Sequence, residues 1–309
     1  MNKMVHENIE DLCKPALYRA VAAEFFGTLF LVLFGCGAID NNAAAVSGQG
    51  SVVQIALTFG LVYGSMVWCF NHVSGGHFNP AVSVAAVVCR RASVVRGLFF
   101  ILAQLVGAIS GAGILRGLTG ADAATMGVTK VSDLLMEAQA FGIELLITFV
   151  LVFTVLASTD DKRNDLSGSA PLTIALAVVA GHLFAFRYTM ASMNPARTFG
   201  PAVVQNIWVN HWVYWVGPII GGLVAALVYE YVFAAGASFS RTKKFVLKHR
   251  KPSEKPKKTG NSEEMNSSKA GLIETPAVAE NEGDAVVEME KIEEKKEEEE
   301  APVEAKAAE

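Results

Sequence analysis

The sequence predicts an all-α membrane protein with six transmembrane helices and two re-entrant half-helices, arranged as an inverted repeat. Three observations lead to this fold class. Six apolar stretches each have close to the roughly 20 residues that a helix needs to cross a bilayer. Short motifs recur once in each half of the chain. Each half contains three of the apolar stretches, which is an odd number.

Charge is distributed unevenly along the 309 residues. Residues 1–240 contain 12 Lys+Arg and 13 Asp+Glu, whereas residues 241–309 contain 14 and 17. The first region is too apolar for a soluble domain, in which about a quarter of the residues are charged. The second has too little apolar surface to offset the entropy cost of ordering it. We therefore expect a membrane domain at 20–233 between an N-terminal segment, 1–19, and a largely disordered tail, 234–309.

The apolar stretches are predicted as helices because a backbone in lipid has no water to bond and satisfies its own hydrogen bonds. They lie at residues 20–39, 52–70, 98–115, 141–157, 172–186 and 212–233.

Basic residues gather in alternate loops and set the expected orientation. They precede the first stretch, lie between the second and third and between the fourth and fifth, and follow the sixth. The opposite loops hold few, with none at residues 40–51. Cytoplasmic loops carry the excess of Lys and Arg. We expect a multi-pass protein of the plasma membrane with both termini in the cytoplasm.

The halves of the chain repeat each other. Asn79-Pro80-Ala81 follows the second stretch, and Asn194-Pro195-Ala196 occupies the equivalent place 115 residues later. Because three spans separate the copies, the second copy is upside down in the membrane. Repeats of this kind place their functional site near the midplane, between the copies.

Each triplet opens an apolar segment that is too short to cross, at residues 81–88 and 196–204. Asn is a favoured N-cap and Pro is tolerated in the first helical turn. We therefore expect two half-helices whose N-termini, with their positive dipole ends, meet in the middle of the membrane.

These motifs resemble the signature loops of the aquaporins, the major intrinsic protein family. The resemblance covers about residues 17–233 and includes Gly181-His182 and Gly200-Pro201-Ala202. It implies a homotetramer with one water pore in each subunit. Asn79 and Asn194 are then expected to offer amide donors to passing water, and the positive midplane opposes protons and cations.

The resemblance also implies an outer constriction formed by Phe59, His182, Ala191 and Arg197. Arg197 supplies a fixed cation with several donors. His182 adds bulk where glycerol-conducting relatives typically have a small residue. Together with Thr198 and Ala202 beyond the second triplet, these residues favour a water-selective pore.

Other interpretations of these residues stay open at this point. Phe59 could be a packing or lipid-facing aromatic residue, His182 a hydrogen-bonded core histidine and Arg197 an interfacial cation. Glu24 and Glu144, at matching repeat positions, are expected to be structural carboxylates that accept backbone N–H bonds from the re-entrant loops. His77 fits an inner vestibule or loop packing equally well.

The tail contains a weaker signal. Residues 241–258 hold nine Lys+Arg and one acid, which fits topological anchoring or, alternatively, binding of anionic lipid. Ser253 follows Arg250-Lys251-Pro252 and is a candidate phosphorylation site. Residues 259–309 hold five Lys and sixteen acids, a composition typical of a solvated extension.

We expect neither an enzyme nor an ion channel, since the sequence has no cluster of nucleophile, base or metal ligands and no ring of acids. The four cysteines form no CxxC pair. No metal, cofactor or nucleic acid is expected; the partners are water and membrane lipid. Two alternatives remain: a structural or junctional membrane protein with this fold, or a channel with additional small neutral permeants.

Overall fold

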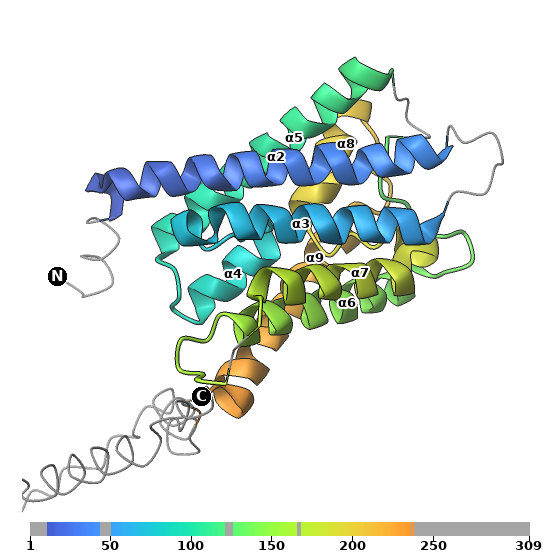
Figure 1. Cartoon of the computed structure of the whole chain (residues 1–309). Helices are drawn as coiled ribbons and strands as arrows, with labels where there is room; N and C mark the ends of the chain where they lie inside the picture. Colours follow the sequence, from blue (N-terminus) through green and yellow to red (C-terminus); the bar gives the residue numbers. More distant parts are fainter. Residues whose placement is uncertain (1–10, 44–50, 121–125, 166–167, 236, 238–309) are drawn as a thin grey trace, which may run out of the picture. The chain divides into compact units, whose positions relative to one another are not determined.

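The computed structural model describes residues 11–43, 51–120, 126–165, 168–235 and 237. Within them, six helical spans are long and apolar enough to cross a membrane, and no strand is present. Five spans are single α-helices: α2 (Pro15–Ala43), α3 (Val52–Ser74), α5 (Val94–Thr119), α6 (Glu137–Ser158) and α7 (Ala170–Thr189). The sixth is α9 (Val213–Val228), continued by a π-helical turn, η1 (Tyr229–Phe233). The short helices α4 (Pro80–Val88) and α8 (Pro195–Gln205) complete the predicted fold class, which is confirmed (Figure 1).

Five of the six spans extend beyond their predicted apolar stretches, and capping groups define several of the ends. α5 begins after Ser93, whose Oγ accepts a hydrogen bond from the backbone N–H of Arg96, and ends at Gly120 in the left-handed conformation. Ser51 and Ser169 cap α3 and α7 in the same way. A serine oxygen satisfies one of the backbone donors that a helix N-terminus leaves free.

The packing repeats across the two halves. α2 packs on α5 as α6 packs on α9, and α2 contacts α3 as α6 contacts α7. Each half-helix packs mainly on the last span of the other half: α4 on α9, and α8 on α5. α3 and α7, equivalent to each other, lie side by side (Figure 1). The halves are therefore interlocked copies.

Glycines allow the closest of these contacts. A Cβ at Gly107 on α5 would overlap the carbonyl oxygen of Phe25 on α2, and a Cβ at Gly221 on α9 would overlap that of Leu145 on α6. Small residues let helix backbones approach closely in membranes, where apolar burial alone gives little association. The two contacts stand at equivalent positions of the repeat.

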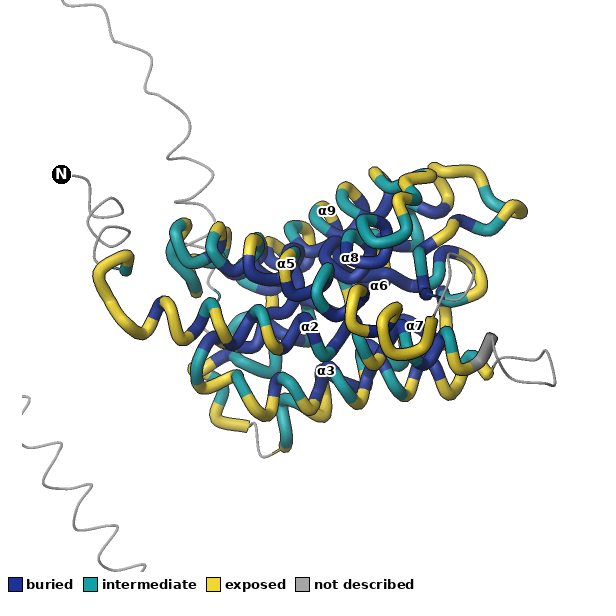
Figure 2. The backbone as a smooth tube through the Cα atoms, turned by 90° about the horizontal axis from the view of Figure 1, so that it is seen from above, coloured by how far each residue is buried: buried dark blue, intermediate teal, exposed yellow. Residues whose placement is uncertain are grey.

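Burial follows from this arrangement. Buried residues run along the middle of the bundle, and exposed residues cover the outer faces of the helices (Figure 2). The exposed faces are apolar, with Leu61, Trp68 and Leu176 each more than half exposed. The centre instead holds buried polar side chains, among them Glu24, Asn79, Glu144, Asn194 and Arg197. An apolar outer surface around a polar centre is expected of a helical bundle surrounded by lipid.

Candidate functional site

The two triplets begin α4 and α8. Asn79 is the N-cap of α4, and its Oδ1 accepts a hydrogen bond from the backbone N–H of Ala81 at 2.9 Å. Asn194 caps α8, with Oδ1 accepting from Ala196 at 2.9 Å and from Arg197 at 3.3 Å. A proline occupies the first turn in both helices. The local chemistry therefore matches the expected role of Asn and Pro at these positions.

The asparagines also bond across the repeat. Asn79 Nδ2 donates to the carbonyl of Met193, and Asn194 Nδ2 donates to the carbonyl of Phe78, each at 2.8 Å. These bonds join the N-termini of α4 and α8 at the centre of the bundle. An amide NH2 has two hydrogens, so one donor on each asparagine is left for another acceptor.

Glu24 holds the first re-entrant loop. Its carboxylate accepts from the backbone N–H of His77 at 2.9 Å and of Phe78 at 2.6 Å. Ser74 Oγ and Gln104 Nε2 donate to the same carboxylate at 2.6 and 2.8 Å. Glu24 is fully buried, so its negative charge is compensated by four donors rather than by water.

Glu144 does the same for the second loop. It accepts from the backbone N–H of Ser192 at 2.9 Å and of Met193 at 2.8 Å, and from Thr189 Oγ1 at 2.7 Å. It too is fully buried. The structure thus places both carboxylates behind the loops, as the sequence led us to expect.

These bonds offset backbone strain. Phe78 and Met193, the residues directly before the two asparagines, have φ of 47° and 52°. Ala191 has φ of 48°, and its repeat equivalent Gly76 has φ of 63°. A non-glycine residue in this left-handed region costs about 1–2 kcal/mol. The loops hold this conformation because the buried carboxylates bind the N–H groups that it presents.

Phe59, His182 and Arg197 lie together on the α8 side of the crossed asparagines. The rings of Phe59 and His182 stack with centroids 4.3 Å apart, and Arg197 Cζ lies 5.1 Å from the Phe59 centroid. All three side chains are at most 2% exposed, so a lipid-facing Phe59 and an interfacial Arg197 are wrong interpretations. Ala191, also buried, lies in the loop that precedes α8.

Arg197 is held by the loop before α6. Its Nη1 donates to the carbonyl of Gly127 at 2.6 Å. Thr129 Oγ1, two residues further along, donates to Thr198 Oγ1 at 3.2 Å. The loop therefore covers the first turn of α8.

A narrow cavity connects the asparagines to this group. Its volume is about 10 Å3, close to the roughly 10–15 Å3 that one water molecule requires by the same measure. Its lining includes Asn79, Asn194, Phe59, His182 and Arg197. Among the described residues, no hydrogen-bond partner exists for His182 Nε2 or for Arg197 Nε and Nη2. Buried polar atoms are normally satisfied, so these atoms indicate a polar occupant of the cavity.

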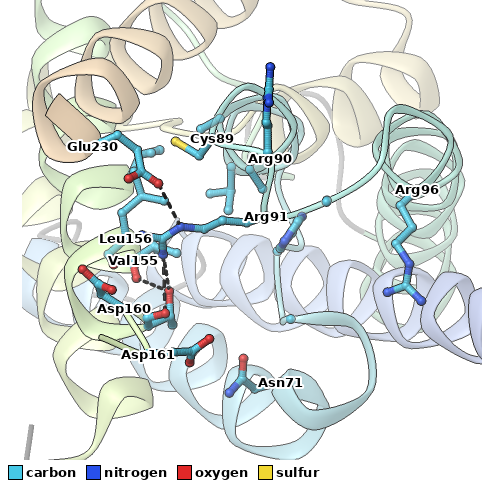
Figure 3. Close-up of a pocket in the computed structure, with 18 of the residues that line it drawn as sticks. Asn71, Cys89, Arg90, Arg91, Arg96, Val155, Leu156, Asp160, Asp161 and Glu230 are labelled. Carbon is cyan, nitrogen blue, oxygen red and sulfur yellow. Dashed lines mark hydrogen bonds and ion pairs between the residues drawn. The ribbon is translucent and has the colours of Figure 1, made fainter. Parts of the chain in front are cut away.

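A much wider cavity of about 580 Å3 opens on the α4 side. Figure 3 shows Arg91 reaching across its wall from the turn after α4. Arg91 Nη1 donates to the carbonyl of Leu156 at 3.1 Å and to Thr159 Oγ1 at 3.2 Å, and Nε lies 3.8 Å from a carboxylate oxygen of Glu230. This side chain therefore joins the turn after α4 to the end of α6 and to η1.

Asp160 anchors η1 from the same wall. Although burial opposes its charge, hydrogen bonds from the backbone of Lys162, the Tyr229 hydroxyl and the backbone of Ala235 lower the pKa of Asp160 below its usual 3.8. Burial raises the pKa of the Cys89 thiol, which also lines this cavity, to about 11. Cys89 is therefore a poor nucleophile at neutral pH.

His77 both lines a cavity and packs against its neighbours. It lines the wide cavity, and its Nδ1 lies 3.1 Å from Ser83 Oγ while its ring meets Phe100 edge to face. The tail expectations, including Ser253, the basic run 241–258 and the acidic segment 259–309, lie outside the described residues.

Three residues at the site were not identified from the sequence. Gln104 carried a usable signal, since a polar side chain in an apolar span is functional or structural by default. From the sequence, Arg91 is only one of the basic residues that set the expected orientation in the membrane. Gly127 carried no signal, because its contribution is a backbone carbonyl whose partner lies 70 residues away.

The chain is similar to known proteins over most of its length. The family profile described as major intrinsic protein matches residues 11–229. The chain is 49% identical to "Aquaporin-4" of Mus musculus over 228 residues, which are 73% of this chain and 71% of the relative. It is 44% identical to "Aquaporin-5" of Homo sapiens, covering 72% and 84%, and 44% identical to "Lens fiber major intrinsic protein" of Lithobates pipiens, covering 77% and 90%.

The fold also matches a solved structure. The aquaglyceroporin from Plasmodium falciparum superposes with a TM-score of 0.64, at 23% identity, over 70% of this chain and 96% of that one. At this identity the likeness concerns the fold alone.

Proposed function

Since the chain belongs to the major intrinsic protein family, we propose that it is a passive, water-selective membrane channel driven by an osmotic gradient. The observation that carries this function is the narrow cavity of about 10 Å3 with its unpartnered donors. A cavity of this size has room for about one water molecule. It holds no pair of groups arranged for proton transfer to a substrate, and the activity we propose is transport without chemistry.

The asparagines orient the permeating water. Asn79 and Asn194 each keep one amide hydrogen free after the crossed bonds to Met193 and Phe78. A water between them accepts both hydrogens through its oxygen and turns its own hydrogens away along the file. The N-termini of α4 and α8 add positive potential at the same point. Both effects oppose proton and cation passage.

The selectivity filter consists of Phe59, His182, Ala191 and Arg197. The stacked rings of Phe59 and His182 narrow the path, while His182 Nε2 and the free guanidinium nitrogens of Arg197 bind water. A polyol would have to shed more of its hydration to pass than these few donors replace. Arg197 also repels cations.

The membrane context completes the proposal. The termini face the cytoplasm of the plasma membrane, so the wide cavity is the inner vestibule and the Arg197 side is the outer one. Residues 20–233 form the pore domain, and 234–309 form a cytoplasmic tail whose basic run contacts anionic lipid or anchors the topology. The subunits form a homotetramer, which fits the exposed apolar faces of α3 and α7.

Stopped-flow measurements on proteoliposomes test this function. We expect fast water efflux under an osmotic gradient, with urea and glycerol crossing no faster than in protein-free vesicles. Glycerol permeability comparable to that of water would contradict water selectivity. Absence of water flux from correctly folded protein would favour a structural role.

A further inference from the structure

Arg197 has a single described hydrogen-bond acceptor for its guanidinium group. Nη1 donates to the Gly127 carbonyl at 2.6 Å, whereas Nε and Nη2 have no partner among the described residues. The guanidinium is 1% exposed. The direction in which its two free nitrogens point is therefore set largely by where the Gly127 carbonyl lies, together with the Phe59 ring beneath it.

The position of the Gly127 carbonyl depends on the absence of a side chain at Gly127 itself. Gly127 has φ of 73°, in the region that L-residues rarely adopt. A Cβ at this position would lie 3.0 Å from Ile39 Cδ1, 3.1 Å from Cys36 Sγ and 3.2 Å from Cys36 Cβ. To admit a methyl group here, Ile39 or Cys36 on α2 would have to move by a few tenths of an ångström, so the packing of α2 disfavours a larger residue at this position.

The neighbours of Gly127 fix the loop on its other sides. Met126 is fully buried, and Thr129 bonds to Thr198 at 3.2 Å, one residue beyond Arg197. The Gly127 carbonyl is therefore a rigid acceptor and not the tip of a free loop.

We propose that Gly127, seated on Cys36 and Ile39, is a positioning residue that aims Arg197 into the pore and thereby sets the exclusion of small solutes. The inference rests on the proposed water-channel function. In this proposal the packing of α2, in the first repeat, acts through Gly127 on the orientation of Arg197, a filter residue of the second repeat.

The test compares two glycines that have similar positive φ angles. Gly127→Ala introduces both strain and the contact with α2, which displaces the carbonyl. Gly120→Ala is the matched control: Gly120 has φ of 69°, but its Cβ position has no packing neighbour within 4 Å in the described part of the chain. Both proteins are reconstituted at equal amounts, and water, urea and proton permeabilities are measured on the same vesicles.

We expect Gly127→Ala to raise the ratio of urea to water permeability by about fivefold or more, equivalent to about 1 kcal/mol of lost discrimination. Gly120→Ala should keep the wild-type ratio. Adding Cys36→Ala to Gly127→Ala should recover part of the discrimination, because it removes the sulfur against which the new methyl presses.

Unchanged exclusion of urea by a folded Gly127→Ala protein would overturn the inference, as would an equal leak in Gly120→Ala. If Gly127→Ala does not assemble, Cys36→Leu presses on Gly127 from α2 and decides the question by the same ratio. A wild-type protein that conducts no water, or that passes urea freely, would refute the proposed function instead.

Discussion

The two re-entrant loops share nearly every backbone feature but differ in their side chains, including the residue directly after each Asn-Pro-Ala triplet. Each has a buried carboxylate behind it, a left-handed residue before the asparagine and a crossed bond to the other loop. After Asn-Pro-Ala, however, the first loop continues with Val82 and the second with Arg197. Both residues are buried. The scaffold is therefore symmetric, whereas three of the four proposed filter residues, including the only cation among them, belong to the second repeat.

The difference extends to what surrounds each half-helix. The cavity beside Arg197 measures about 10 Å3, whereas the separate cavity on the α4 side measures about 580 Å3. Duplication thus provides two equivalent supports, and in our proposal the Arg197 cation with the stacked rings of Phe59 and His182 turns one side of the bundle into a filter. Mutations of the supports should act alike in both halves, and mutations of the filter should not.

The largest effect is expected from removing the supports. Glu24→Ala and Glu144→Ala each leave at least two buried backbone N–H groups without a hydrogen-bond acceptor. Each such group lowers the free energy of unfolding by about 1–3 kcal/mol. Both variants should lower the yield of folded protein and its melting temperature to a similar extent, measured in detergent by size exclusion and thermal unfolding.

Glu137→Ala, an exposed carboxylate on the same α6, serves as the control: it loses one exposed hydrogen bond, from Trp212 Nε1, and should lower stability much less. A Glu144 variant as stable as this control would break the proposed equivalence of the two loops.

The second largest effect is expected from mutating the proposed filter residues. His182→Gly combined with Arg197→Val widens the constriction and removes its cation, so urea permeability should increase about tenfold or more, equivalent to at least about 1.4 kcal/mol. Val82→Ala, the matched change in the first repeat, should leave urea excluded. Equal leaks from the two variants would show that selectivity is shared between the repeats.

Sensitivity of water flux to external mercury tests the same difference between the two re-entrant loops. Ala191→Cys places a thiol beside the filter and should make water flux sensitive to brief external mercuric chloride. The wild-type channel should resist it, because Cys36 is buried and the pKa of Cys89 is raised to about 11. Water flux is the readout, and recovery with a thiol reductant is the control. Strong inhibition of the unmodified channel would require a reactive cysteine along the path.

The smallest effect concerns the wall of the wide cavity. Asp160→Asn should cost about 1 kcal/mol, since it weakens hydrogen bonds to a charged acceptor. Because the pKa of Asp160 is lowered from 3.8, its charged form stabilises the fold above pH 3.8, and this contribution is lost as pH falls through the lower folded-state value.

The difference in melting temperature between wild type and Asp160→Asn should therefore be constant from pH 5 to 8 and shrink only below pH 3.8. A difference that changes near neutral pH would point to another titrating group.

The structural features that the sequence could predict are those that depend on residues close together in the chain. The helical spans follow from apolar length, and Asn79 and Asn194 follow from N-cap preference, because both depend on neighbouring residues. Glu24 and Glu144 could be expected from burial of a charge at matching repeat positions. The ends of the spans could not be placed closely, since Ser93 and Gly120 cap α5 outside its apolar stretch.

Long-range backbone contacts explain the rest. No pattern near Gly127 reveals that its carbonyl meets Arg197, and the packing against Cys36 depends on a helix 90 residues earlier in the chain. The π-helical turn at Tyr229–Phe233 was likewise not expected from an apolar stretch, because its conformation depends on the bonds that Asp160 makes to Tyr229 and Ala235.

The crossed bonds of Asn79 and Asn194 also impose an order on biogenesis. Each links atoms at least 114 residues apart in sequence. While the ribosome is still synthesising the second half, the first three spans can enter the bilayer, but the amide of Asn79 has no Met193 carbonyl to bind. The first re-entrant loop therefore stays incomplete until its counterpart arrives, and neither half-channel can mature alone. Closing such distant contacts is intrinsically slow, so release from the insertion machinery should precede the final docking of α4 against α8.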